Sequence, residues 1–90
     1  MSLRDWRMDL LALGYHGEHR YEDLRNAIGF TGARLESLER LPAKRDPDWP
    51  KWAARATIGF VGVSARGETD IEALGRLLVQ VIQLTRQKAA

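Results

Sequence analysis

Cysteine is absent from this chain of 90 residues, and its only prolines, three in number, lie between residues 42 and 50. The absence of cysteine excludes disulfide frameworks, thiolate zinc sites and cysteine nucleophiles, and it fits a reducing compartment. The chain also lacks a run of about 20 uncharged apolar residues and the pattern of a signal peptide. We therefore expect a cytoplasmic protein with no membrane partner. Whether Met1, Ser2 and Leu3 are native stays open.

The net charge of the chain is also small. The chain has 14 Lys and Arg against 12 Asp and Glu, a formal net charge of +2, and 44% of its residues are hydrophobic. This composition is typical of one small globular domain, which we place over residues 1–90. A chain this short buries only somewhat more than ~60% of its unfolded surface, so a second subunit could be needed to complete its core.

Helical periodicity is clear in the first third of the chain. Leu3, Trp6, Leu10 and Leu13 recur at intervals of three and four, which predicts a helix over residues 3–13 that ends at Gly14. A second amphipathic helix is predicted over residues 21–28, closed by Gly29 and carrying apolar residues at Tyr21, Leu24, Ala27 and Ile28.

A third helix is expected directly after the second. Thr31 is a suitable N-cap and Pro42 a suitable stop, with apolar positions between them at Ala33, Leu35, Leu38 and Leu41. The proline-rich stretch that follows, residues 42–50, reads as a surface connection.

Residues 51–64 are open between two interpretations. As a helix from about Asp48 to Val63, the stretch has Asp48 as its cap and Pro50 in the first turn. As a strand near residues 56–63, it is rich in β-branched side chains. We favour the helix because the sequence shows no partner strand, although a strand that pairs across a dimer would remove that argument.

The C-terminal helix has the clearest signals. Thr69 and Glu72 form a capping box, and the apolar stripe that follows covers roughly 160° of the helix. A stripe this wide indicates either the central element of the fold or a helix shared with a second subunit. For a shared helix, the expected dimer interface is Ile71, Leu74, Leu78, Val81 and Ile82. The predicted fold is mainly α, a small bundle of four or five short helices, with one strand near residues 56–63 as the open alternative.

Around Gly29, apolar residues occupy the positions of a helix pair joined by a tight turn: Leu24, Ile28, Phe30, Leu35 and Leu38. In these residues, segment 21–41 resembles the helix-turn-helix element of bacterial DNA-binding regulators. The resemblance implies that Gly29 permits the turn, that Phe30 fills the angle between the helices, and that the later helix lies in the major groove. The implied DNA-contacting residues are Thr31, Gly32, Ala33, Arg34, Ser37, Arg40, Lys44 and Arg45.

Signals for catalysis are weak. Ser64 has no nucleophile-elbow pattern, and residues 59–62 lack the lysine of a phosphate-binding loop. His16 and His19 lie in a predicted turn without a third ligand, so we expect no metal, no cofactor and no enzymatic activity.

Two functions compete. The first is a small helix-turn-helix-like regulator that binds double-stranded DNA as a homodimer. The alternative is a helical protein-interaction or assembly module without nucleic-acid binding, with Trp49, Trp52 and the C-terminal helix as its contact surfaces.

Overall fold

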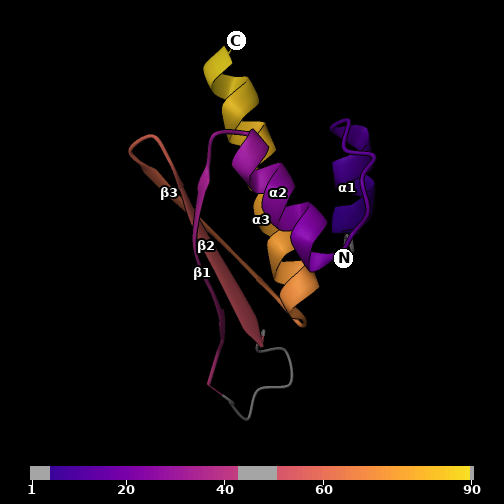
Figure 1. Cartoon of the computed structure of the whole chain (residues 1–90), viewed down its shortest axis with the longest axis vertical. Coiled ribbons are helices and arrows are strands. Elements are labelled where there is room, and N and C mark those ends of the chain that lie inside the picture. Colours follow the sequence, from indigo (N-terminus) through magenta and orange to yellow (C-terminus); the bar gives the residue numbers. More distant parts are fainter. Residues whose placement is uncertain (1–4, 43–50, 90) are drawn as a thin grey trace.

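The computed structural model describes residues 5–42 and 51–89, which form a three-stranded sheet with two helices on one face and a third, N-terminal helix packed against the C-terminal one (Figure 1). The helices are α1 (Trp6–Ala12), α2 (Tyr21–Phe30) and α3 (Asp70–Ala89). The strands are β1 (Arg34–Arg40), β2 (Trp52–Ile58) and β3 (Val61–Gly67), which are antiparallel in the order β1-β2-β3. The predicted mainly helical bundle is therefore wrong, and the fold is α+β.

The three helices lie close to their predicted places. In α1, Trp6 and Leu10 are buried, and in α2 the buried residues are Leu24 and Ile28. Thr69 caps the first turn of α3 as predicted, since the backbone amide of Glu72 donates to Oγ1 of Thr69 at 3.1 Å. The carboxylate of Glu72, however, accepts from the amide of Glu68 at 3.3 Å and not from that of Thr69. These helices were predictable because an amphipathic stripe is a local pattern.

The stretch that fits both a helix and a strand belongs to a β-hairpin. Gly59 has a φ of 61° and is the first of two residues that join β2 to β3, the position at which a type II′ turn requires glycine. The pairing runs from Ile58 opposite Val61 to Trp52 opposite Gly67. The helix expected from about Asp48 to Val63 is wrong, because the partner strand that seemed to be missing begins at Val61, three residues after Ile58.

A strand also replaces the third helix expected over residues 31–41. Leu35 and Leu38 have the three-residue spacing of a helix, but an irregularity between Leu35 and Ser37 adds one residue to β1 relative to β2. This bulge places both leucines on the same face of the strand, opposite Ala56 and Ala54 respectively. The bulge therefore imitates helical periodicity in a strand.

The turn that precedes β1 lies later than predicted. Gly29 is within α2, and the glycine with left-handed backbone is Gly32, at a φ of 90°. Thr31 ends α2 and is no N-cap, because its hydroxyl donates to the carbonyl of Ile28 at 2.6 Å. Phe30 is 91% exposed, so it fills no angle between helices.

Helix α3 is the central element, which explains its wide apolar stripe. It packs on β2 and β3 and also contacts α1 and α2. Small buried side chains on the sheet, at Ala54, Ala56 and Ala65, leave room for the large buried side chains of α3. Leu74, Leu78 and Val81, expected at a dimer interface, are fully buried within one chain, and Ile71 and Ile82 are partly buried against the same core. The stripe is therefore covered without a second subunit.

None of the helices in the described part of the chain has both the length and the hydropathy needed to cross a membrane.

Candidate interaction surface

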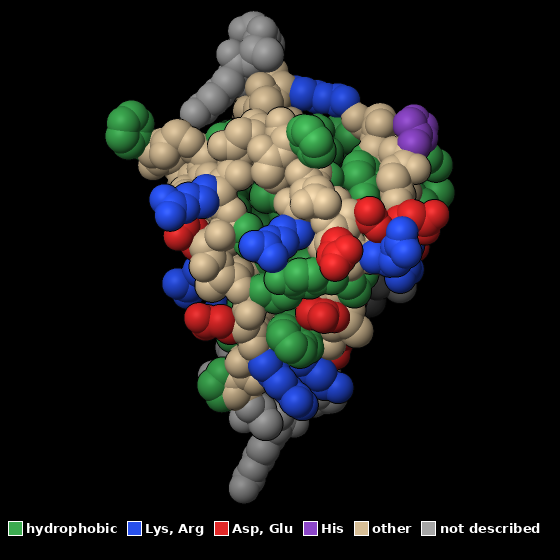
Figure 2. All heavy atoms as spheres, in the orientation of Figure 1, with side chains coloured by type: hydrophobic (Ala, Val, Ile, Leu, Met, Phe, Trp, Pro, Cys, Tyr) green, Lys and Arg blue, Asp and Glu red, His purple; other side chains and the backbone are tan. Residues whose placement is uncertain are grey.

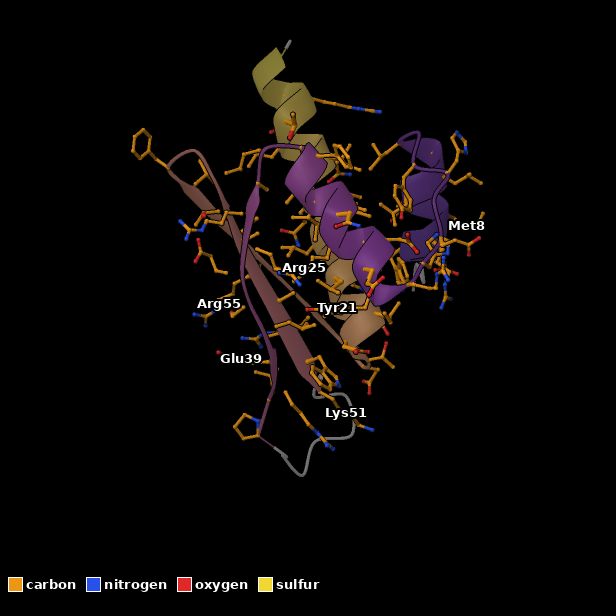
Figure 3. The ribbon with its side chains drawn as sticks, viewed as in Figure 1. Met8, Tyr21, Arg25, Glu39, Lys51 and Arg55 are labelled. Carbon is orange, nitrogen blue, oxygen red and sulfur yellow. The ribbon has the colours of Figure 1, made fainter. Side chains whose placement is uncertain are left out.

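An open groove lies between α2 and the start of β1. Its volume is about 660 Å³, and it is lined by Arg25, Asn26, Gly29, Phe30, Arg34 and Leu35. The four lining residues of α2 are one helical turn apart in pairs, so a single face of α2 forms one wall. In Figure 3 the side chain of Arg25 extends from α2 toward β1.

The polar side chains of the groove are mainly basic. Nε of Arg34 lies 4.0 Å from a carboxylate oxygen of Glu36, which also accepts a hydrogen bond of 2.9 Å from the hydroxyl of Thr57. Because that contact is long and its arginine is exposed, it holds Arg34 only weakly. Arg25 has no ion pair with any side chain in the described residues. The groove therefore combines two available guanidinium groups with the exposed ring of Phe30.

Apolar surface is also visible on this side of the molecule. Figure 2, in the orientation of Figure 1, shows hydrophobic side chains between basic and acidic ones where α2 and β1 face the viewer. Leu35 is only partly buried, and it is packed against the core at the floor of the groove. A partner could thus bury apolar surface here while its acidic groups meet the arginines.

The two edges of the sheet differ in how their backbone groups are occupied. On β3, the side-chain amide of Gln80 donates to the carbonyl of Ser64 at 2.9 Å, and Arg76 donates to the carbonyl of Arg66 at 3.5 Å. Helix α3 therefore occupies acceptors that face away from β2. On β1, no side chain in the described part of the chain bonds to the strand backbone in this way. Among the residues that the structure describes, the edge of β1 is therefore the one open to an added strand.

The register shows which backbone groups of β1 face outward. Since the carbonyl of Ser64 faces away from β2 and successive residues alternate in direction, Ala65 directs its amide and carbonyl toward β2. Its partner Ala54 then faces β3, away from β1. Leu38 lies opposite Ala54, so its own amide and carbonyl face the free edge.

The same alternation applies one pair further along the sheet. Val63 adjoins Ser64 on its other side and so faces β2, where its partner is Ala56. Leu35 lies opposite Ala56 and therefore directs its amide and carbonyl outward, beside the groove. Leu35 and Leu38 thus offer backbone donors and acceptors to an incoming strand.

The opposite face of the sheet is polar. Figure 3 shows Arg55 and Glu39 on the side of the sheet away from the helices. Ser37 and Ser64 flank Arg55 in the register, which gives this face small and charged residues. Such a face is ordinary for an antiparallel sheet with helices on one side only.

A second, smaller cavity lies beside α1. It has a volume of about 280 Å³, and its lining includes Met8 and Leu11, which are 70% and 59% exposed. His16 and His19 also line it, and His19 packs edge-on against Trp6 with a centroid distance of 5.3 Å. In the residues that the structure describes, no three His, Cys, Asp or Glu side chains come together to hold a metal ion.

The residues expected to contact DNA are not gathered on one helix. Thr31, Gly32 and Ala33 form the turn after α2, and Arg34, Ser37 and Arg40 lie on β1. Lys44 and Arg45 lie outside the described residues, as does Trp49. Trp52 begins β2 and is partly buried against the core.

Sequence reasoning misses the groove itself. The resemblance to a helix-turn-helix element points to Arg34 for a different reason, and it does not point to Arg25 or Asn26 as contact residues. The only local signal is that Gly29, one turn after Arg25, leaves its position on this face of α2 without a side chain.

Comparisons of this chain with protein-family models, with curated proteins and with solved structures found no match.

Proposed function

We propose that this chain is a protein-interaction module that binds an extended polypeptide strand along the free edge of β1. The observation that carries the proposal is the contrast between the two sheet edges. Side chains of α3 occupy outward carbonyls of β3, whereas no described side chain bonds to the outward groups of Leu35 and Leu38, and Leu35 also lines an open groove. Strand addition to such an edge derives affinity from main-chain hydrogen bonds.

The groove supplies selectivity for the added strand. Alternate side chains of that strand point toward the helix layer, where Leu35 and Phe30 offer apolar contact. Arg25 lies on the α2 wall and Arg34 at the strand, and a guanidinium group binds a carboxylate through paired hydrogen bonds. The preferred occupant is therefore a strand that combines apolar residues with acidic ones.

DNA binding stays a prediction. The segment expected to enter the major groove as a helix is the strand β1, and its open edge favours the protein-interaction alternative instead. Duplex DNA serves as a control ligand in the experiment, because phosphate contacts by Arg25 or Arg34 would produce affinity that falls steeply with added salt.

The experiment is a selection of displayed random heptapeptides on the immobilised full chain. We expect enriched peptides to alternate apolar residues and to contain Asp or Glu. Their synthetic versions should bind the chain at least tenfold more tightly than the variant Leu38→Pro. Proline removes the outward amide of Leu38, and it is tolerated on an edge strand at a position whose amide faces solvent.

Two controls keep the selection interpretable. Circular dichroism of Leu38→Pro establishes that the variant is folded, and Arg25→Gln tests the wall of the groove without altering the strand backbone. The proposal is overturned if peptides bind wild type and folded Leu38→Pro equally, or if no peptide is enriched while duplex DNA binds.

A further inference from the structure

Strand β1 is complementary to itself when two copies run antiparallel. Its first six residues read Arg-Leu-Glu-Ser-Leu-Glu, from Arg34 to Glu39. With Leu35 of one copy opposite Leu38 of the other, Arg34 falls opposite Glu39 at both ends of the pairing. Each copy then meets an opposite charge and an apolar side chain at matching positions, the kinds of cross-strand pair that stabilise a sheet.

The bulge makes this register possible. In a regular strand, residues three or five apart point to opposite faces. The two side chains of each proposed cross-copy pair would then lie on opposite faces of the joined sheet and could not touch. The extra residue in β1 changes this, because Leu35 and Leu38 lie opposite Ala56 and Ala54, two residues apart on β2. Arg34 and Glu39 lie opposite Thr57 and Ala53, which also share a face of β2. Each proposed pair therefore lies on a single face of the joined sheet.

The backbone groups match the same register. The amides and carbonyls of Leu35 and Leu38 face the free edge, as the pairing of β1, β2 and β3 requires. Residues that face each other in this way across an antiparallel pair exchange both of their hydrogen bonds. The side chain of Leu38 from one copy would also lie beside Leu35 at the groove floor of the other.

We propose that the strand bound at the edge of β1 is β1 of a second copy of this chain, so that two sheets of order β1-β2-β3 join into one through a two-fold axis. This inference rests on the proposed function and names its partner. Edge strands that are guarded against pairing carry charges that repel one another, often lysines. In β1 the charges have both signs, and in this register they attract.

The test is the native mass of the full chain by light scattering and analytical ultracentrifugation over a wide concentration range. Wild type should form a dimer. Arg34→Glu and Glu39→Arg each place like charges opposite one another twice per dimer, so each should weaken self-association about tenfold or more. The double variant carrying both substitutions restores opposite charges and should recover the wild-type dimer. Glu18→Arg, the same change of charge in an exposed loop, should leave the dimer unchanged.

The outcomes separate this inference from the proposed function. A chain that stays monomeric at every concentration, a dimer indifferent to the single reversals, or a double variant that fails to recover would each overturn the second copy as partner. If peptides from the random library nevertheless bind wild type and not folded Leu38→Pro, the interaction module stands and only its partner is wrong. If both experiments fail, the edge of β1 is not a binding site.

Discussion

The indole of Trp6 lies against the backbone of Gly75, where α1 crosses α3. A methyl group added at Gly75 would lie 2.1 Å from Cε3 of Trp6, far inside van der Waals contact. Trp6 is 6% exposed, so its ring has little room to move away. Gly75 thus allows α1 to contact α3 at a position where any side chain would push the two helices apart.

We therefore expect Gly75→Ala to destabilise the protein. Overpacking costs typically about 1–3 kcal/mol, which exceeds the gain of about 1 kcal/mol from replacing glycine by alanine inside a helix. Urea unfolding followed by circular dichroism measures the difference.

Gly29→Ala is the matched control. Gly29 is also helical, but nothing lies within 4 Å of the position of an added Cβ, so this variant should be more stable than wild type by roughly 0.5–1 kcal/mol. Equal effects of the two substitutions would show that Trp6 does not limit the space at Gly75.

The helices could be predicted from the sequence, and the sheet could not. Each helix presents its apolar residues at a local period, and Thr69 marks the start of α3. In β2, by contrast, Ala53, Ala54 and Ala56 are strong helix formers, and tertiary pairing overrides that preference. The bulge in β1 also favoured a wrong helix prediction, because it gives Leu35 and Leu38 of a strand the three-residue spacing of a helix.

The groove required information that no local pattern contains. It exists because α2 and β1 lie side by side at one edge of the sheet, while Gln80, far along the chain, covers the opposite edge at Ser64. Nothing in the sequence around Arg25 or Arg34 indicates that the two side chains line the same groove. Only the order of the strands tells which edge stays open.

Thr69→Ala should destabilise α3 at its first turn. The hydroxyl oxygen of Thr69 accepts from the amide of Glu72 at 3.1 Å, and loss of such a cap costs about 1 kcal/mol. Thr85→Ala is the same substitution within the same helix, where the hydroxyl of Thr85 donates to the carbonyl of Val81. Because alanine is the better helix former there, we expect little loss or a small gain. Thermal unfolding of both variants tests the contrast, and equal losses would contradict it.

Stability should depend on Tyr15 at high pH. Burial raises the pKa of the Tyr15 hydroxyl, and the carboxylates of Asp23 and Glu18 raise it further. The same hydroxyl donates to the carbonyl of Glu18 at 2.7 Å, which an ionised phenolate could not do. Since the folded-state pKa lies above the unfolded value of about 10, the contribution of Tyr15 is complete below that pH. It is lost as the pH rises through the folded-state pKa.

Tyr15→Phe isolates this contribution. At pH 8 the variant should be less stable than wild type by about 1 kcal/mol, and the difference should shrink as the pH rises above about 10. Urea unfolding at a series of pH values provides the measurement. Tyr21→Phe is the control, since the Tyr21 hydroxyl has no hydrogen bond within the described residues. A difference that stays constant with pH would contradict the role given to Tyr15.

Gln80→Met should open the edge of β3. Methionine preserves the length of the side chain but has no amide to donate to the carbonyl of Ser64, whose hydrogen bond from Gln80 is 2.9 Å long. We expect a loss of about 0.5–1.5 kcal/mol in the free energy of unfolding. We also expect larger assemblies at high concentration, because an edge with unsatisfied carbonyls pairs with other strands.

Gln83→Met separates the two causes of that change. Gln83 is exposed on the same helix, and no hydrogen bond joins its side chain to the rest of the described chain, so this variant adds the same apolar surface without opening an edge. Sedimentation velocity should show larger species for Gln80→Met only. If both variants assemble alike, the added methionine rather than the uncovered carbonyl is the cause, and the contrast between the two sheet edges loses its energetic support.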